Sequence, residues 1–311
     1  MTRGRRHSSS LLPGGQEGSH VATVHRRAPV RGTTSMTAIA LTIAGSDSGG
    51  GAGIQADLKT FSALGVYGCS VITALTAQNT LGVQGIHPIE PAFVRRQLDS
   101  VMGDLAVGAV KIGMLGTPEI IAAVADGLEA WRPRWIVLDP VMVAKGGDKL
   151  LRDEAVAALR ERLLPLASLI TPNLPEAGVL LGIDPPTARR QMPQVAARLQ
   201  GLGARDVLLK GGHLEGAESP DLLLHGGELH WLEAPRLATR HTHGTGCTLS
   251  AAIAALLARG LPPSLAVFEA KRWLGSAIAA ADGLAIGQGI GPVHHFHAWW
   301  PQAETPGTAD G

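Results

Sequence analysis

The chain is 311 residues long, about twice the ~150 residues of a typical domain, so it forms one large domain or two small ones. Apolar residues make up 45% and charged residues 17%, which excludes an intrinsically disordered chain. With 27 Lys and Arg against 26 Asp and Glu, the net charge of +1 argues against a strongly basic nucleic-acid-binding protein.

The first 35 residues differ from the rest of the chain. Residues 1–35 hold six Arg and one Glu, a net charge of +5, which leaves −4 for the remainder. They lack the apolar core of about 7–15 residues that marks a secretory signal, although their Arg and Ser content superficially suits a transit peptide. Because Met36 directly precedes the first predicted strand, we expect a disordered extension over 1–35 or a start codon placed too far upstream. The prediction continues with one domain over 36–300 and a disordered tail over 301–311.

Beyond this arm, short apolar runs alternate with helical patterns. The predicted strands cover Ile39–Ala44, Cys69–Ala74, Val107–Ile112, Trp135–Leu138, Leu166–Ile170 and Val207–Leu209, with a hairpin of Leu222–Leu224 and Glu228–Leu232. The predicted helices cover Ile54–Leu64, Pro91–Met102, Pro118–Leu128, Glu154–Leu163, Pro175–Leu181, Pro193–Leu202, Thr248–Ala258 and Ser264–Ala281. This alternation predicts an α/β fold with a mostly parallel sheet and helices on both faces.

Polar and glycine-rich segments follow most of the predicted strands. These segments are 45–53, 78–80, 139–148, 171–176, 210–213 and 243–247. In open parallel sheets the carboxyl ends of the strands form the ligand-binding edge. The pattern therefore favours an enzyme with one composite site.

The first of these segments contains an incomplete dinucleotide fingerprint. Gly51, Gly53 and Ala56 match its spacing, but the following strand ends in Gln78 and lacks the acidic residue that would bind a ribose. No Gly-Lys-Ser/Thr follows, so the turn is not a Walker A loop. We expect a tight turn that packs a helix onto the sheet and lets a small ligand approach the backbone.

The last segment, His243 to Cys247, leads directly into a helix. Small residues leave the backbone N–H groups of a helix start open, and these groups favour an anion such as phosphate. Cys247 falls in the first turn, where the pKa of a thiol can be lowered, so it reads as a proton acceptor or an electrostatic helper. The competing interpretation is a small buried residue.

Two cysteines are too few for a disulfide framework or a four-ligand zinc site, so we expect a reducing, cytoplasmic setting. Cys69 lies within a predicted strand and is interpreted as a packing residue. No apolar stretch reaches the ~18 residues of a membrane-spanning helix. His294, His295 and His297 are adjacent in sequence and make a poor metal site, so a structural role is favoured.

Several motifs together go beyond general physics. They are Thr42–Asp47 with Gly50–Thr60, Thr73–Thr80, Lys111–Leu115, Thr171–Ala177, Lys210–His213, His243–Cys247 and Gly289–His297. This set closely resembles the hydroxymethylpyrimidine/phosphomethylpyrimidine kinases of thiamine biosynthesis, a branch of the ribokinase-like superfamily. The resemblance covers residues 37–300 in the expected order. One departure is Ser48-Gly49, where the family usually has Pro-Ser.

The resemblance implies a three-layer α/β/α sandwich and two successive phosphoryl transfers from ATP. The first transfer goes to the hydroxymethyl group of 4-amino-5-hydroxymethyl-2-methylpyrimidine, and the second converts the monophosphate to the diphosphate. ATP as co-substrate, Mg²⁺ and a homodimer are further family expectations, with no nucleic-acid or membrane partner.

The resemblance also implies roles for individual residues. The catalytic loop comprises Gly244, Thr245, Gly246 and Cys247; the substrate-binding residues are Gln78, Asp57, Gly45, Met114 and Val141; the nucleotide-binding residues are Lys210 and Asn173; and the Mg²⁺ ligands are Asp139 and Glu176. The chemistry is suitable, because an amide can pair with an aminopyrimidine edge and Mg²⁺ prefers oxygen ligands. Each residue also has a plain structural alternative, such as a helix-start acid for Glu176 and a turn residue for Asn173.

Two other functions stay open. A pyridoxal kinase would also phosphorylate a flat heteroaromatic alcohol, but Ala77–Thr80 and Lys111–Met114 favour the pyrimidine. A catalytically silent nucleotide-binding regulatory protein is a different class. The presence of Asp139, Glu176 and Lys210, together with the cysteine of the loop, argues against it.

Overall fold

The computed structural model describes Met1 and residues 37–142 and 153–300. The elements described below belong to one compact unit, Thr34–Gly311. The predicted disordered arm, the predicted tail over 301–311 and the part of the strand-end segment at 143–148 lie outside the described residues. No helix in the described ranges combines the length and apolar character that a membrane crossing requires.

The described residues form a nine-stranded sheet in the order β3-β2-β1-β4-β5-β6-β7-β8-β9. The strands are β1 (Ile39–Asp47), β2 (Tyr67–Asn79), β3 (Gly82–Pro88), β4 (Ala109–Ile112), β5 (Ile136–Leu138), β6 (Leu169–Ile170), β7 (Asp206–Lys210), β8 (Asp221–His225) and β9 (Glu228–Leu232). The strands from β2 through β7 in this order pair in parallel, whereas β3, β8 and β9 join antiparallel. The predicted mostly parallel sheet and its terminal hairpin are confirmed.

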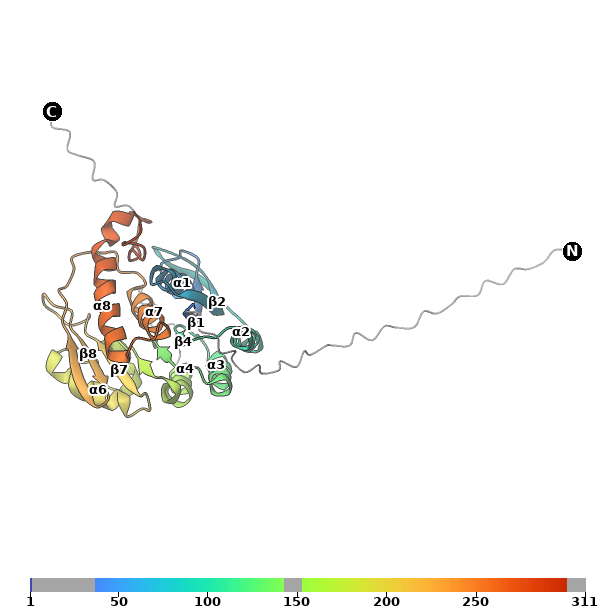
Figure 1. The fold of residues 1–311 in the computed structure, drawn as a ribbon, viewed down its shortest axis with the longest axis horizontal. Coiled ribbons are helices and arrows are strands. Elements are labelled where there is room, and N and C mark those ends of the chain that lie inside the picture. The colour runs from blue at the N-terminus through green and yellow to red at the C-terminus, as the bar shows by residue number, and fades with distance from the viewer. Residues whose placement is uncertain (2–36, 143–152, 301–311) are drawn as a thin grey trace, which may run out of the picture. The chain divides into compact units, whose positions relative to one another are not determined.

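Helices cover both faces of the sheet (Figure 1). They are α1 (Gly53–Ala63), α2 (Pro91–Asp104), α3 (Pro118–Trp131), α4 (Asp153–Ala158), α5 (Leu174–Leu181), α6 (Met192–Gln200), α7 (Thr245–Ala258) and α8 (Pro263–Ala279), with short helical turns at Leu159–Leu163, Leu164–Leu166, Arg189–Gln191 and Ala281–Leu284. One apolar core lies between the sheet and α2 to α6, and a second lies under α1, α7 and α8. This is the three-layer α/β/α sandwich that the resemblance implied.

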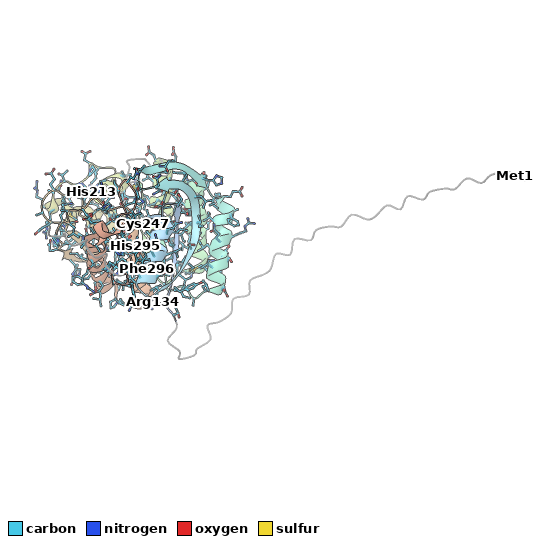
Figure 2. The ribbon with its side chains drawn as sticks, turned by 90° about the horizontal axis from the view of Figure 1, so that it is seen from above. Met1, Arg134, His213, Cys247, His295 and Phe296 are labelled. Atoms are coloured by element: carbon cyan, nitrogen blue, oxygen red, sulfur yellow. The ribbon has the colours of Figure 1, made fainter. Side chains whose placement is uncertain are left out.

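Successive residues of a buried strand supply the two cores alternately, because their side chains point to opposite faces. In β1, Ala40 joins the core under α7, whereas Leu41 and Ile43 join the other. Helix α7 lies between α1 and α8 (Figure 1) and is apolar on nearly every side, so it is buried along most of its length. Figure 2 shows the side chains on this frame, with Cys247 and His295 in the interior and Arg134 at its edge. The start of α7 is thereby held at the carboxyl edge of the sheet.

Strand β3 was not predicted, and β2 is longer than the predicted Cys69–Ala74. The physical reason is exposure: five of the seven residues of β3 are exposed, so the strand has no buried face to give an alternating pattern. β3 pairs with the second half of β2, from Ala74 opposite Pro88 to Asn79 opposite Gly82. This pairing carries Gln78 beyond the body of the sheet, beside the ligand-binding edge.

Candidate active site

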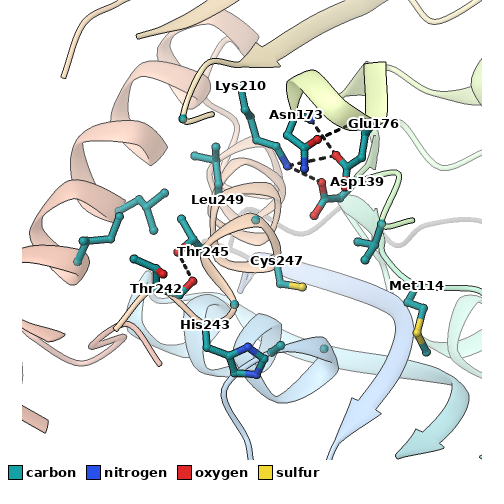
Figure 3. A pocket seen from close by; sticks show the side chains of 18 of the residues that line it. Met114, Asp139, Asn173, Glu176, Lys210, Thr242, His243, Thr245, Cys247 and Leu249 are labelled. Atoms are coloured by element: carbon teal, nitrogen blue, oxygen red, sulfur yellow. Dashed lines mark hydrogen bonds and ion pairs between the residues drawn. The ribbon is translucent and has the colours of Figure 1, made fainter. Parts of the chain in front are cut away.

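A cavity of about 900 Å³ opens at the carboxyl edge of the sheet. Twelve of the predicted site residues line it: Gly45, Gln78, Met114, Asp139, Val141, Asn173, Glu176, Lys210, Gly244, Thr245, Gly246 and Cys247. Figure 3 shows the charged cluster around Lys210 at one end, His243 and Met114 toward the other, and Cys247 between them. The predicted composite site therefore has both a polar, charged end and a less charged one.

The glycine-rich turn before α7 forms the middle of the cavity wall. Gly244 precedes the helix with φ at 75°, and a Cβ at this position would come within 1.9 Å of the Gly51 carbonyl oxygen. The Thr245 hydroxyl donates to the Thr242 carbonyl at 2.7 Å, which fixes the turn. The helix begins at Thr245, three residues before its predicted start. N–H groups in the first turn of a helix have no acceptor within it, so this turn is suited to an anion in the cavity.

Lys210 lies between two carboxylates at the charged end of the cavity. Its Nζ is 2.9 Å from Asp139 Oδ1 and 4.0 Å from Glu176 Oε2. Burial alone would lower the pKa of Lys210, but these carboxylates raise it above its usual value, so the ammonium stays charged. A Cβ on Gly246 would lie 3.4 Å from both Lys210 Nζ and Asp139 Oδ2. The turn before α7 therefore packs directly against this ion pair.

Asn173 and Glu176 form a capping box at the start of α5. The Asn173 side chain accepts from the Glu176 N–H at 2.8 Å, and Glu176 Oε2 accepts from the Asn173 N–H at 2.8 Å. Burial raises the pKa of Glu176 to about 7; Lys210 lowers it and the neighbouring Asp139 raises it. The helix-start role considered for Glu176 is thus present, and Asn173, considered as a turn residue, caps the same helix; both residues line the cavity.

Cys247 is half-buried because one side of it faces the cavity. The surrounding protein nevertheless desolvates the thiol and raises its pKa to about 11, although Lys111 and the Gly53 N–H act in the opposite direction. The expectation of a lowered pKa is therefore wrong, because burial has the largest effect on this thiol. At neutral pH the side chain is a thiol and not a thiolate.

Asp57 is not among the residues that line the cavity. Its carboxylate is fully buried and accepts from Lys111 Nζ at 2.7 Å and from the Thr42 hydroxyl at 2.6 Å. Burial lowers the pKa of Lys111, but the opposing effects, led by the Asp57 carboxylate, together raise it above its usual value. Burial raises the pKa of Asp57, and Lys111 opposes this rise. The predicted direct contact between Asp57 and the substrate is corrected accordingly: in this structure Asp57 lies behind the cavity wall and is paired with Lys111 and Thr42.

The other end of the cavity is built around Gly45 and Gln78. A Cβ on Gly45 would come within 2.5 Å of Met114 Cε, so the glycine makes room for this side chain. The Gln78 backbone N–H donates to the Ser48 hydroxyl at 2.9 Å, and this hydroxyl in turn donates to the Gln78 carbonyl. Val141 completes the predicted wall. Apolar walls beside a single amide are suited to a flat ring with a polar edge.

Neither Asp47 nor His243 was assigned a role in the site from the sequence. Asp47 accepts from the N–H groups of Gly49, Gly51 and Ala52 at 2.8–3.1 Å, and its Oδ2 lies 3.1 Å from His243 Nε2. An Asp at a strand end before a glycine run is a recognised turn signal and could have indicated the first role. No local pattern indicates its pairing with a histidine 196 residues away.

A second cluster missed from the sequence borders the cavity beyond Lys210. Lys271 donates to Asp221 Oδ2 at 2.6 Å, and Asp221 Oδ1 accepts from the Gly211 N–H. Arg236 donates to the carbonyls of Gly212, Leu214, Gly216 and Glu218 and so ties down the loop after β7. The predicted Lys210 segment is held in place by these groups, which come from β8, α8 and the chain after β9.

The sequence is similar to those of known kinases. Residues 47–294 match the family described as phosphomethylpyrimidine kinase. The hydroxymethylpyrimidine/phosphomethylpyrimidine kinase of Escherichia coli K12 is 59% identical over 263 residues, which are 84% of this chain and 98% of that protein.

Two solved structures share the fold. The ADP complex of Bacillus subtilis pyridoxal kinase superposes with a TM-score of 0.79 at 40% identity, over 85% of this chain and 99% of that one. The phosphomethylpyrimidine kinase of Clostridium difficile gives 0.69 at 44% identity, over 77% and 99%. The ribokinase-like fold that the motifs implied is confirmed.

Proposed function

This chain belongs to the phosphomethylpyrimidine kinase family, and on that premise we propose that it phosphorylates a hydroxymethylpyrimidine with ATP and then phosphorylates the product to the diphosphate. The observation that carries the proposal is a single cavity that joins two kinds of wall. One wall has an anion-binding helix start beside Lys210 and two carboxylates. The other has apolar side chains beside the amide of Gln78.

The charged end of the cavity suits phosphoryl transfer, which depends on positioning and charge neutralisation more than on covalent chemistry. In the proposal, the N–H groups of Gly244–Cys247 hold the migrating phosphoryl group, and Lys210 neutralises the nucleotide phosphates with Asn173 beside it. Cys247 assists as a neutral thiol next to the acceptor hydroxyl. The loop N–H groups, rather than a thiolate, supply most of the stabilisation.

The residues at this end fit a bound Mg²⁺. Asp139 and Glu176 offer carboxylate oxygens into the cavity, and the ammonium of Lys210 shows that positive charge is favoured between them. Within residues 37–142 and 153–300, no group of three or more His, Cys, Asp or Glu could hold a metal by itself. These two carboxylates would therefore share the ion with water and nucleotide phosphates. When bound, Mg²⁺ would neutralise phosphate charge.

The pyrimidine would lie at the other end, between Gly45, Met114 and Val141, with its polar edge against Gln78. An amide can accept from the 4-amino group and donate to a ring nitrogen. Pyridoxal is the second candidate substrate, since a pyridoxal kinase shares this fold at 40% identity. Both substrates present a primary alcohol on a flat ring.

A coupled ATP-consumption assay tests the function. Hydroxymethylpyrimidine, its monophosphate and pyridoxal are compared side by side with the purified full chain. We expect turnover with both pyrimidines and at least tenfold lower kcat/KM with pyridoxal, a difference of about 1.4 kcal/mol. Preference for pyridoxal would reassign the substrate. If no ATP is consumed with any of the three compounds, the silent regulatory protein is favoured.

The expected homodimer and cytoplasmic location belong to the same proposal. Leu75 and Leu81 are exposed at the β2–β3 hairpin, which offers apolar side chains to a second copy. Both cysteines are free thiols, which suits a reducing compartment. Light scattering of the full chain tests the first point, and we expect twice the mass of 32.2 kDa.

A further inference from the structure

His243 connects the two glycine-rich turns at the substrate end of the cavity. Its Nε2 lies 3.1 Å from Asp47 Oδ2 and 3.3 Å from the terminal nitrogen of Gln78. Burial raises the pKa of Asp47, but hydrogen bonds from His243 and from the Ala52 and Gly49 N–H groups lower it overall. Asp47 is thus a carboxylate that can only accept. His243 Nε2 must carry the hydrogen, so it cannot also accept from the amide nitrogen of Gln78.

The imidazole ring is held in this position. A Cβ on Gly51 would come within 2.4 Å of His243 Cδ2, so the ring packs directly on the glycine. The His243 backbone N–H donates to the Gly291 carbonyl at 3.0 Å. Turning the ring away would break its packing on Gly51 and its hydrogen bond to Asp47, so the conflict must be resolved at Gln78.

Thr76 leads independently to the same conclusion. Its Oγ1 lies 2.8 Å from the Ser46 carbonyl oxygen and 3.2 Å from Gln78 Oε1. A hydroxyl has one hydrogen, and the carbonyl can only accept it. The atom of Gln78 that faces Thr76 is then best placed as a donor.

From these two constraints we infer that His243, with Thr76, is a positioning residue that fixes the orientation of the Gln78 amide and thereby the choice between substrate rings. Turning the amide by 180° exchanges its ends without moving other atoms. The single Nε2–H of His243 is then shared between two acceptors, Asp47 Oδ2 and Gln78 Oε1, and Gln78 Nε2 donates to Thr76. One acceptor position and one N–H remain, side by side, for a ligand.

The inference deepens the proposed function and rests on it. A pyrimidine can place its 4-amino group against Oε1 and the adjacent ring nitrogen against Nε2. Pyridoxal, with its hydroxymethyl group in the same place, has an aldehyde oxygen where the pyrimidine has its amino group. That oxygen would face Oε1 acceptor to acceptor, a mismatch that leaves both groups unpaired. A fixed amide therefore selects the aminopyrimidine, whereas a freely turning amide accepts both rings.

The test measures kcat/KM for hydroxymethylpyrimidine and for pyridoxal, together with the KM for ATP. We expect His243→Leu to lower kcat/KM for the pyrimidine about tenfold and for pyridoxal less than about threefold, with the KM for ATP unchanged. His243→Gln should restore selectivity, because its terminal nitrogen can donate to Asp47. Thr76→Val, which removes the other partner of the amide, should also reduce the selectivity.

A double-mutant cycle separates positioning from folding. In a Gln78→Ala background, adding His243→Leu should change kcat/KM less than about twofold, since no amide remains to be oriented. Equal loss for both rings, or an undiminished effect of His243→Leu without Gln78, would overturn the inference. If His243→Leu does not fold, unchanged selectivity in Thr76→Val overturns it. A wild-type chain with no pyrimidine turnover would instead refute the proposed function.

Discussion

A single thiol illustrates how burial alters a chemical role. Cys247 carries a pKa of about 11, so it is protonated throughout the neutral range. We expect Cys247→Ala to lower kcat by about 10–100-fold, less than the loss of a full general base, while the KM for the pyrimidine stays within about twofold. Steady-state kinetics measure both values. Wild-type turnover in Cys247→Ala would reduce the residue to packing. A step in kcat near pH 7 that disappears in this variant would show instead that the thiol ionises in the working range.

The buried ion pair of Lys111 and Asp57 contributes to the stability of the folded protein. Both side chains are fully buried, so Lys111→Met leaves a carboxylate without its charged partner. We expect the free energy of unfolding in urea to fall by about 3–5 kcal/mol. Lys111→Met combined with Asp57→Leu should recover much of this loss, because no unpaired charge remains. A loss below about 1 kcal/mol in the single variant would mean that the pair is not buried as an ion pair.

Cys247 and Asp57 show how much of a site can be predicted from a sequence. The motifs around Cys247 and Asp57 correctly indicated the loop and the helix to which they belong. The pKa of the thiol and the burial of the carboxylate depend on Lys111 and Thr42, which come from other strands. Tertiary contacts of this kind leave no local pattern. For the same reason the pairing of Asp47 with His243 could not be predicted from the sequence.

Among the elements, the turn before α7 depends on a glycine for two separate reasons. Gly244 has a positive φ, and a Cβ there would strike the Gly51 carbonyl. We expect Gly244→Ala to lower kcat/KM by about 100-fold, because displacing the loop misplaces the phosphate-binding N–H groups. Gly260→Ala is a matched control, with φ at 90° and open space around its Cβ. It should lose about 1 kcal/mol of stability and keep its activity. Equal activity in both variants would contradict the close approach of the two turns.

The prediction of elements succeeded where a buried face gives a pattern and failed where it does not. Strands β1, β4, β5 and β7 are apolar and buried, and their predicted positions hold. Strand β3 is exposed and takes its position from pairing with β2. The glycine-rich turn at 45–53 was expected to admit a ligand. Gly45 and Gly53 of this turn line the cavity, and Gly45 and Gly51 also make room for Met114 and for the His243 ring.

For the molecule as a whole, the boundary of the active unit is a prediction of its own. The first strand begins at Ile39, the family match begins at residue 47, and every residue that lines the cavity lies at or after Ala44. We therefore expect a chain shortened to begin at Met36 to keep its kcat/KM within about twofold of the full chain, below a tenfold change of 1.4 kcal/mol. The assay with hydroxymethylpyrimidine measures it. A large loss, with an unchanged melting temperature, would assign the arm a part in the reaction.

The dependence of stability on pH tests whether His295, in the C-terminal segment, stays neutral and buried against α7 in the folded protein. His295 is buried, and its Nε2 lies 3.0 Å from the Thr248 hydroxyl of α7. Burial, with smaller effects of Lys59, His294 and His297, lowers its pKa to about 3. The unfolded chain binds a proton at its ordinary pKa of about 6.5, so the unfolded state binds more protons between these values. This contribution to the free energy of unfolding is complete above pH 6.5 and falls as the pH falls toward 3, by about 1.4 kcal/mol per pH unit. Replacing the histidine by an amide, His295→Gln, should flatten the decline measured by urea unfolding between pH 6.5 and 4.5. An unchanged slope in that variant would mean that His295 is protonated in the folded protein, and that its contact with α7 is open to water.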